Sequence, residues 1–255
     1  METTSSLASR SGVEPRISTP FRASSSAQRE RLFFGGMAIL LAATVVAGFS
    51  RTYYFNDLAA TPFPLTPLLH IHGAVYSAWM LILVAQTTLI SRGLVAWHRR
   101  LGFAGIALAA SMIVLGTAVA ITRTASGAIL DHGPPPLVFL AVPVFGMLVF
   151  AILFGAAVLL RRQAAAHKRL MILATLEIVT AAVSRLPFVE DWGPIGFFGV
   201  IDLFVVALVV HDRATLKRLH VATVWGGLLF VLSQPLRLII GGSAPWISFA
   251  TWLTA

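Results

Sequence analysis

The Lys and Arg residues of this chain alternate between the gaps that separate its long apolar runs. Four segments hold five, three, four and three cations, fifteen of the 19 in all: 10–31, 92–100, 161–169 and 213–218. The alternate gaps hold only Arg51 and Arg123, and the last two cations, Arg185 and Arg237, lie inside apolar runs. Cytoplasmic loops of membrane proteins carry the Lys/Arg excess. The pattern therefore predicts a polytopic membrane protein whose N-terminus is cytoplasmic.

Composition excludes a soluble domain. Hydrophobic residues make up 57% of the 255 positions and charged residues 11%, whereas a soluble domain has about 25% charged residues. The net charge of +9 does not indicate a nucleic-acid partner, because the cations lie at the ends of apolar runs. There they attract anionic lipid headgroups, so the predicted partner is the lipid bilayer. Cysteine is absent, which excludes disulfides and thiolate metal sites.

Seven apolar runs are long enough to cross a bilayer, which takes about 20 residues in a helix. They are 33–50, 68–91, 101–122, 136–160, 169–187, 195–211 and 219–240. We therefore predict an all-α bundle of seven transmembrane helices over residues 33–240. Seven crossings from a cytoplasmic N-terminus place the C-terminus outside. The predicted location is the bacterial cytoplasmic (inner) membrane.

The two flanking segments differ in character. Residues 1–32 are rich in Ser, Thr and Arg, and such a stretch buries too little apolar surface to fold alone. We predict a disordered cytoplasmic tail there. Residues 241–255 contain Trp246 and Trp252, and tryptophan is enriched where membrane meets water. This segment is predicted to be an interfacial tail on the outer side.

Three histidines stand beside basic residues at the starts of outward-running helices: His98, His167 and His220. One interpretation is that these clusters anchor helix ends at the lipid headgroups. The other is that the three imidazoles lie at one depth and bind a divalent metal such as zinc or iron, because histidine is the commonest metal ligand.

Four ionisable residues are predicted to lie inside the membrane. With a rise of about 1.5 Å per residue, Glu177 and Asp202 lie near the midplane. By the same count, Arg185 and Arg237 lie in the outer leaflet. Ionisable residues at such depths face the bundle interior, because exposing them to lipid is costly.

Span two adds polar groups at the outer level, since His72 and Tyr76 share one helical face there, as Gln234 and Arg237 do on span seven. We predict an outer-leaflet ligand site. Its guanidinium groups would hold an anionic group such as a carboxylate or a haem propionate, with an imidazole from His72. Glu177 and Asp202 would pass protons toward the cytoplasm. The predicted site residues are His72, Tyr76, Arg185, Gln234 and Arg237.

A structural interpretation of the same charges stays open. Glu177 would pair with Arg185, and Asp202 with Arg237, as ion pairs that join helices. Long arginine side chains can span part of the axial gap between these levels or extend toward the interface. In that case the charges would hold the bundle together and bind no ligand.

Several motifs carry a family resemblance. The runs His72-Gly73, Trp97 to Gly102 (WHRRLG), His167 to Met171 (HKRLM) and Gln234 to Arg237 (QPLR) resemble those of a group of bacterial seven-helix membrane proteins. That resemblance implies the fold but no particular activity. The run from His98 to Gly102 is also similar to a His-x-Arg-Leu-Gly motif of membrane b-type cytochromes, in which histidine pairs on facing helices bind haem. This second resemblance implies haem as a cofactor.

No Gly-rich phosphate loop, Ser-His-Asp order or dinucleotide fingerprint occurs, so the chain is interpreted as non-catalytic by itself. Three hypotheses remain. The leading one is a redox-accessory protein that binds haem, a quinone or a metal at the outer site. The second is a proton-coupled transporter of small solutes, with Glu177 and Asp202 as proton carriers. The third is a structural or assembly subunit of a larger membrane complex, or a homo-oligomer.

Overall fold

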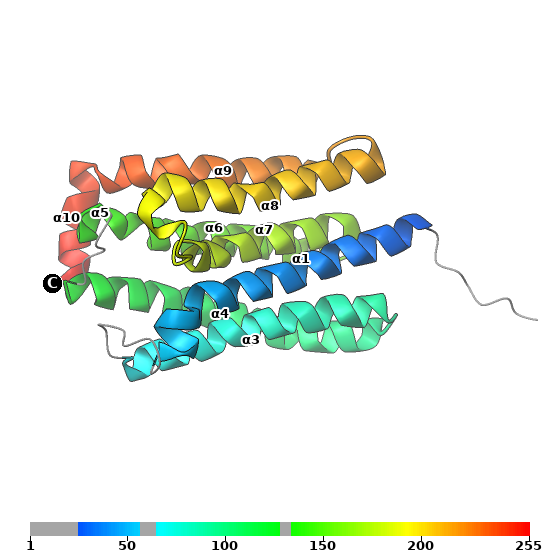
Figure 1. Ribbon diagram of the computed structural model, residues 1–255, viewed down its shortest axis with the longest axis horizontal. Coiled ribbons are helices and arrows are strands. Elements are labelled where there is room, and N and C mark those ends of the chain that lie inside the picture. The colour runs from blue at the N-terminus through cyan, green and yellow to red at the C-terminus, as the bar shows by residue number, and fades with distance from the viewer. Residues whose placement is uncertain (1–24, 57–64, 128–133) are drawn as a thin grey trace, which may run out of the picture.

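The computed structural model describes residues 25–56, 65–127 and 134–255, which form helices and turns without a strand. The long helices lie side by side, and α10 crosses them at one end (Figure 1). In chain order the elements are α1 (Ser25–Phe49), the π-helical turn η1 (Ser50–Tyr54), α3 (Pro67–Ser91), α4 (Val95–Ala125), α5 (Pro136–Phe139), α6 (Ala141–Leu159), α7 (Ala164–Val183), the 3-10 turn η2 (Glu190–Trp192), α8 (Gly193–Leu216), α9 (Val221–Gly241) and α10 (Ala244–Thr254).

Six of the described helical segments are long and apolar enough to cross a membrane. They correspond to α1 with η1, α3, α4, α5 with α6, α8, and α9. The multi-pass, all-helical membrane architecture is therefore confirmed. The fifth predicted run forms α7, which contains Lys168, Arg169 and Glu177. These three charges set α7 apart from the six, and the seventh crossing stays a prediction.

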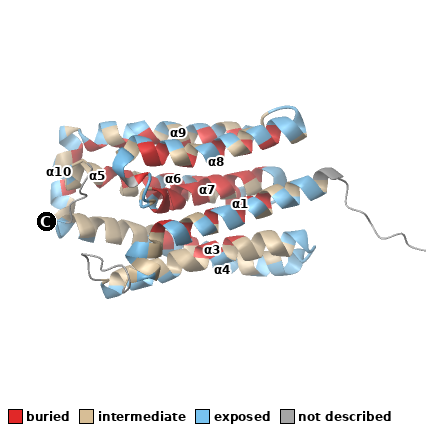
Figure 2. Ribbon diagram, in the orientation of Figure 1, coloured by how far each residue is buried: buried red, intermediate tan, exposed pale blue. Residues whose placement is uncertain are grey.

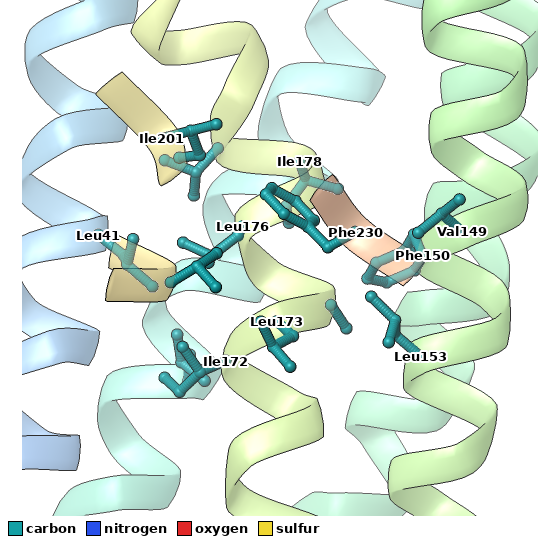
Figure 3. Close-up of a cluster of buried hydrophobic side chains, with 14 of the residues drawn as sticks. Leu41, Val149, Phe150, Leu153, Ile172, Leu173, Leu176, Ile178, Ile201 and Phe230 are labelled. Carbon is teal, nitrogen blue, oxygen red and sulfur yellow. The ribbon is translucent and has the colours of Figure 1, made fainter. Parts of the chain in front are cut away.

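α7 lies at the centre of the bundle, where buried residues concentrate (Figure 2). Almost every side chain from Ile172 to Thr180 is buried, with no polar face left for solvent or lipid. Leu176 of α7 packs in a core that also includes Leu41 of α1 and Phe150 of α6 (Figure 3). A helix buried all round can hold charges only where neighbouring helices supply partners.

Local sequence sets several helix boundaries. α3 begins with Pro67 after Thr66, whose hydroxyl accepts a hydrogen bond from the backbone N–H of Leu69. Proline at the first helical position costs no hydrogen bond, and a Thr side chain caps an otherwise unpaired amide.

The flanking segments differ from prediction where they are described. α1 begins at Ser25, so the predicted tail of residues 1–32 is helical in its last part, and residues 1–24 lie outside the described ranges. At the other end, residues 244–254 form α10. Trp246 is buried, and its indole N–H donates to the carbonyl oxygen of Leu137 at 2.8 Å. Trp246 therefore joins α10 to α5, while Trp252 is exposed.

α1 and α7 approach each other at Gly48. A Cβ atom built on Gly48 would overlap the backbone carbonyl of Ala182. Backbone atoms cannot move aside as a flexible side chain can, so this contact needs a residue without a side chain. The close approach lets α1 pack along α7 and cover it.

We predict that Gly48→Ala lowers the free energy of unfolding by about 1–3 kcal/mol, because overpacking a tight contact strains the backbone. The melting temperature of the purified protein should fall accordingly. The matched control is Gly36→Ala on the same helix, where a new Cβ meets nothing within 4 Å. That change should be neutral or stabilising, because alanine favours a helix over glycine. Equal losses for both variants would contradict this account of the α1–α7 contact.

Candidate functional site

His72 and Tyr76 lie together on the inward side of α3. Their rings stack with centroids 4.0 Å apart, as expected for residues one helical turn apart. The Tyr76 hydroxyl donates to the backbone oxygen of Met112 on α4 at 2.9 Å and lies 3.3 Å from Sδ of Met147 on α6. Nδ1 of His72 is buried and has no hydrogen-bond partner among the described residues. Such an atom is costly to bury.

Space around Tyr76 is filled. A Cβ added at Gly116 of α4 would overlap the Tyr76 hydroxyl and contact the Met147 sulfur. One turn deeper, the Trp79 indole N–H donates to Thr175 of α7 at 3.3 Å. The half of α3 that contains His72 is therefore tied to α4, α6 and α7 through polar contacts among packed side chains.

Arg185 lies just beyond α7, at the same end as His72. It is exposed, and its guanidinium lies over the ring of Phe49 at 4.8 Å. It also interacts electrostatically with His72. Of the five predicted ligand residues, His72, Tyr76 and Arg185 are thus brought to one end of the bundle.

Arg237 pairs with a different carboxylate from the one predicted. Its Nη2 donates to Oε1 of Glu177 at 2.6 Å and to the Ser233 hydroxyl at 2.6 Å. Arg237 and Glu177 are both buried, and Gly146 of α6 gives them room, because a Cβ there would lie 3.3 Å from Nη1 of Arg237. The predicted pairing of Glu177 with Arg185 and of Asp202 with Arg237 is therefore wrong.

Asp202 is bound by the other predicted residue of α9. Nε2 of Gln234 donates to Oδ1 of Asp202 at 2.8 Å. Gln234 is buried and Asp202 half-buried. Both carboxylates predicted to face the interior therefore have interhelical partners, as the cost of exposing charge to lipid requires. Gln234 thus links α9 to α8, and Arg237 links α9 to α7.

A second buried ion pair lies at the basic end and was missed by sequence reasoning. Arg169 donates through Nε to Oδ1 of Asp212 at 2.9 Å, and its Nη2 reaches the same oxygen. The other oxygen, Oδ2, accepts from the Thr223 hydroxyl at 2.6 Å and from the backbone N–H of His220 at 3.0 Å. Neither charged side chain is exposed. Asp212 was overlooked because it stands in a gap rich in cations, where a carboxylate resembles a loop residue.

The three inner histidines do not form one cluster. The rings of His98 and His167 meet edge to face at 6.3 Å, and Nδ1 of His167 is bonded to the Ala157 backbone oxygen at 2.8 Å. His220 instead caps α9, where its Nδ1 accepts from the backbone N–H of Ala222 at 3.1 Å. Among the described residues no group of three His, Asp or Glu side chains is placed to hold a metal ion.

The surroundings of His220 favour the neutral form of its imidazole. Burial and the nearby Arg169 guanidinium lower its pKa below the usual 6.5. A neutral Nδ1 can accept the Ala222 hydrogen bond, whereas a protonated one cannot. His220 therefore acts at the start of α9 as a capping residue.

A shallow groove of about 340 Å³ lies away from all these residues. It runs along α8 and is lined by Trp192, Ile195, Gly196, Gly199, Val200 and Leu203. Because the groove is apolar, it suits lipid contact more than recognition of a polar ligand.

Taken together, the apolar helices and the internal ion pairs define an all-helical, multi-pass membrane protein. Comparisons of the chain with family models, with curated proteins and with solved structures gave no match. The function is therefore argued from the residues alone.

We predict that Glu177→Leu destabilises the protein by about 3–5 kcal/mol, because it leaves the Arg237 charge buried without a counter-charge. The double variant Glu177→Leu/Arg237→Leu should recover much of this loss, since well-packed apolar pairs often replace buried ion pairs at little cost. Thermal unfolding in detergent measures both. Asp202→Asn is the matched control, because an amide oxygen still accepts from Gln234. A double variant as unstable as the single one would contradict the pairing.

Proposed function

We propose that the chain crosses the bacterial inner membrane seven times, with its basic end in the cytoplasm and its C-terminus outside. The support for α7 as the seventh span is that each of its charges meets an opposite charge from another helix. Lys168 pairs with Glu30 at 2.6 Å, Arg169 with Asp212, and Glu177 with Arg237. Pairing within the bundle removes the main barrier to placing a charged helix in a bilayer.

This topology predicts distinct labelling of single cysteines, which the cysteine-free chain allows. Asp191→Cys, beyond α7, should react with a membrane-impermeant maleimide on intact cells, as should Trp252→Cys. Arg162→Cys should react only after the membrane is permeabilised. If α7 does not cross, Asp191→Cys will behave like Arg162→Cys, and the seven-span proposal fails.

The proposed activity is non-catalytic binding of a quinone-type ligand at the outer end, beside His72, Tyr76 and Arg185. One observation carries it: the buried Nδ1 of His72, which lacks a partner among the described residues. A quinone oxygen accepts a hydrogen bond from an imidazole N–H, and a nearby guanidinium favours the charge that grows on a reduced ring. The planar quinone ring would lie next to the aromatic rings of His72 and Tyr76, which stack on each other.

Haem and metal fit the described residues less well. A metal ion would need more ligands than His72 alone, and no three-residue group of His, Asp or Glu is found in the described ranges. A haem macrocycle would have to displace Tyr76, whose hydroxyl already fills the space beside Gly116 and Met147. A quinone ring is smaller than a haem macrocycle and would need a smaller displacement of the side chains near Arg185.

We predict that a short-tailed benzoquinone raises the melting temperature of the purified protein and quenches its tryptophan fluorescence with saturation. His72→Leu and Arg185→Gln should each weaken binding about tenfold or more, since losing a hydrogen bond to a charged or polar partner costs ~1.5–3 kcal/mol. His70→Leu is the matched control, an exposed histidine two residues away on the same helix. If His70→Leu and His72→Leu bind alike, the ligand site is elsewhere.

One observation favours proton-coupled transport as a second candidate. Pro235 lies inside α9, next to Gln234 and its partner Asp202. α9 stays one continuous helix over Val221–Gly241, but a proline inside a helix removes one backbone hydrogen bond, and locally weakened helices with polar groups are typical of transporter binding sites. Proton flux in proteoliposomes that disappears in Asp202→Asn would favour this function over quinone binding. The assembly-subunit hypothesis and the relation to the bacterial seven-helix group stay predictions.

A further inference from the structure

The basic segments of the chain meet at one end of the bundle, around the start of α7. Lys168 of α7 pairs with Glu30 of α1, and the ring of His167 meets that of His98 on α4. Arg31 of α1 donates to the last residue of α3, the Ser91 carbonyl oxygen, at 3.2 Å. Contacts between side chains thus join α1, α3, α4 and α7 at this end.

The remaining basic segment, residues 213–218, joins the same end through α8. The buried Arg169–Asp212 pair links α7 to α8, and the backbone N–H of His220 extends this link to the start of α9. The ring of Phe33 on α1 stacks on His211 of α8 at 3.9 Å. The described parts of the four basic stretches, which include only residues 25–31 of the first, therefore lie together at one end of the bundle.

This surface keeps its cations outside and its carboxylates inside. Within the described residues, the carboxylates at this end are Glu30 and Asp212, and each is paired with a cation of α7. Ten exposed cations surround them, which we call the basic rim: Arg29, Arg31, Arg92, Arg99, Arg100, Arg161, Arg162, Arg213, Lys217 and Arg218. Because these carboxylates are used internally, the charge of the rim has to be balanced from outside the described residues.

The start of α4 places this charge beside exposed apolar surface. Trp97 is 59% exposed, and the Arg100 guanidinium lies 5.3 Å from its ring centroid. Val95 and Phe103 on the same helix are also exposed. An aromatic ring, a long cationic side chain and neighbouring apolar groups suit the boundary between headgroups and acyl chains. A free anion would use the cations but not the apolar surface.

We propose that the basic rim binds anionic phospholipid headgroups, with the phosphodiester held by the arginines and the acyl chains lying against Trp97 and Phe103. Guanidinium groups form paired hydrogen bonds with phosphate oxygens. Each cation near an anionic membrane surface contributes about 1 kcal/mol, so several together select anionic over zwitterionic lipid strongly. This proposal does not depend on the quinone site at the opposite end.

The test places the full chain in nanodiscs of phosphatidylcholine with a minor share of phosphatidylglycerol, and then measures the lipid retained after detergent extraction by native mass spectrometry. We expect phosphatidylglycerol to be enriched over its share in the disc. A variant with four glutamines in place of Arg99, Arg100, Arg161 and Arg162 should lose this enrichment. Each removed cation should lower the preference for phosphatidylglycerol by about fivefold at most. The matched control, Arg51→Gln, removes an exposed cation at the other end and should keep it.

A second measurement covers the case in which the quadruple variant fails to fold. For the unaltered protein, phosphatidylglycerol should raise the melting temperature more than phosphatidylcholine does, and the difference should shrink at high salt, because exposed charges are screened. Equal stabilisation by both lipids would overturn the proposal. An equal effect of glycerol phosphate in solution would identify a soluble anion as the ligand and also overturn it. Loss of enrichment in Arg51→Gln would show that total charge, not the rim, is responsible.

Discussion

The bundle depends on the rule that a charge taken out of water must meet an opposite charge. Three of the residues that α7 buries or half-buries are charged, and three other helices supply the partners: Glu30 from α1, Asp212 from α8 and Arg237 from α9. Breaking one partner of a buried pair costs more than the pair contributes. These pairs therefore set the depth and rotation of α7, and the apolar core of Figure 3 packs around this helix.

How much of this arrangement can be predicted from the sequence depends on whether a feature is local or joins segments that are distant in the chain. The apolar runs and their basic ends predicted helices near their observed places, because length and hydropathy act locally. The depth of Glu177 and Asp202 was also predicted from residue counts. Their partners were not, since depth gives a level along the axis but no direction around it. Arg185 and Arg237 were predicted at one level, yet Glu177 meets Arg237 because α9 lies beside α7.

The two ends of the molecule use their polar groups differently. At the basic end, the Arg169–Asp212 pair has its hydrogen bonds completed by Thr223 and the backbone of His220, as suits a structural joint. At the opposite end, His72 keeps a buried nitrogen without a partner among the described residues, next to an exposed arginine. Completed networks give rigidity, whereas an incomplete one stores a cost that a ligand can remove. Buried atoms without a partner among the described residues also occur at the basic end, at Nδ1 of His98 and Nε2 of His211. The ligand hypothesis therefore rests on His72 together with Tyr76 and Arg185, and not on an unpaired atom alone.

The pairing of α7 also has a consequence for biosynthesis. A ribosome makes α1 and its Glu30 before α7, but Asp212 and Arg237 emerge only after α7 has left the exit tunnel. Until then Arg169 and Glu177 have no counter-charges, and the newly made helix is too polar to remain stably in lipid by itself. If α7 crosses the membrane as proposed, its insertion is completed late, with α8 and α9 as the helices that retain it. A chain truncated before α9 is thus expected to hold α7 unstably in the membrane, although every residue of α7 has been made.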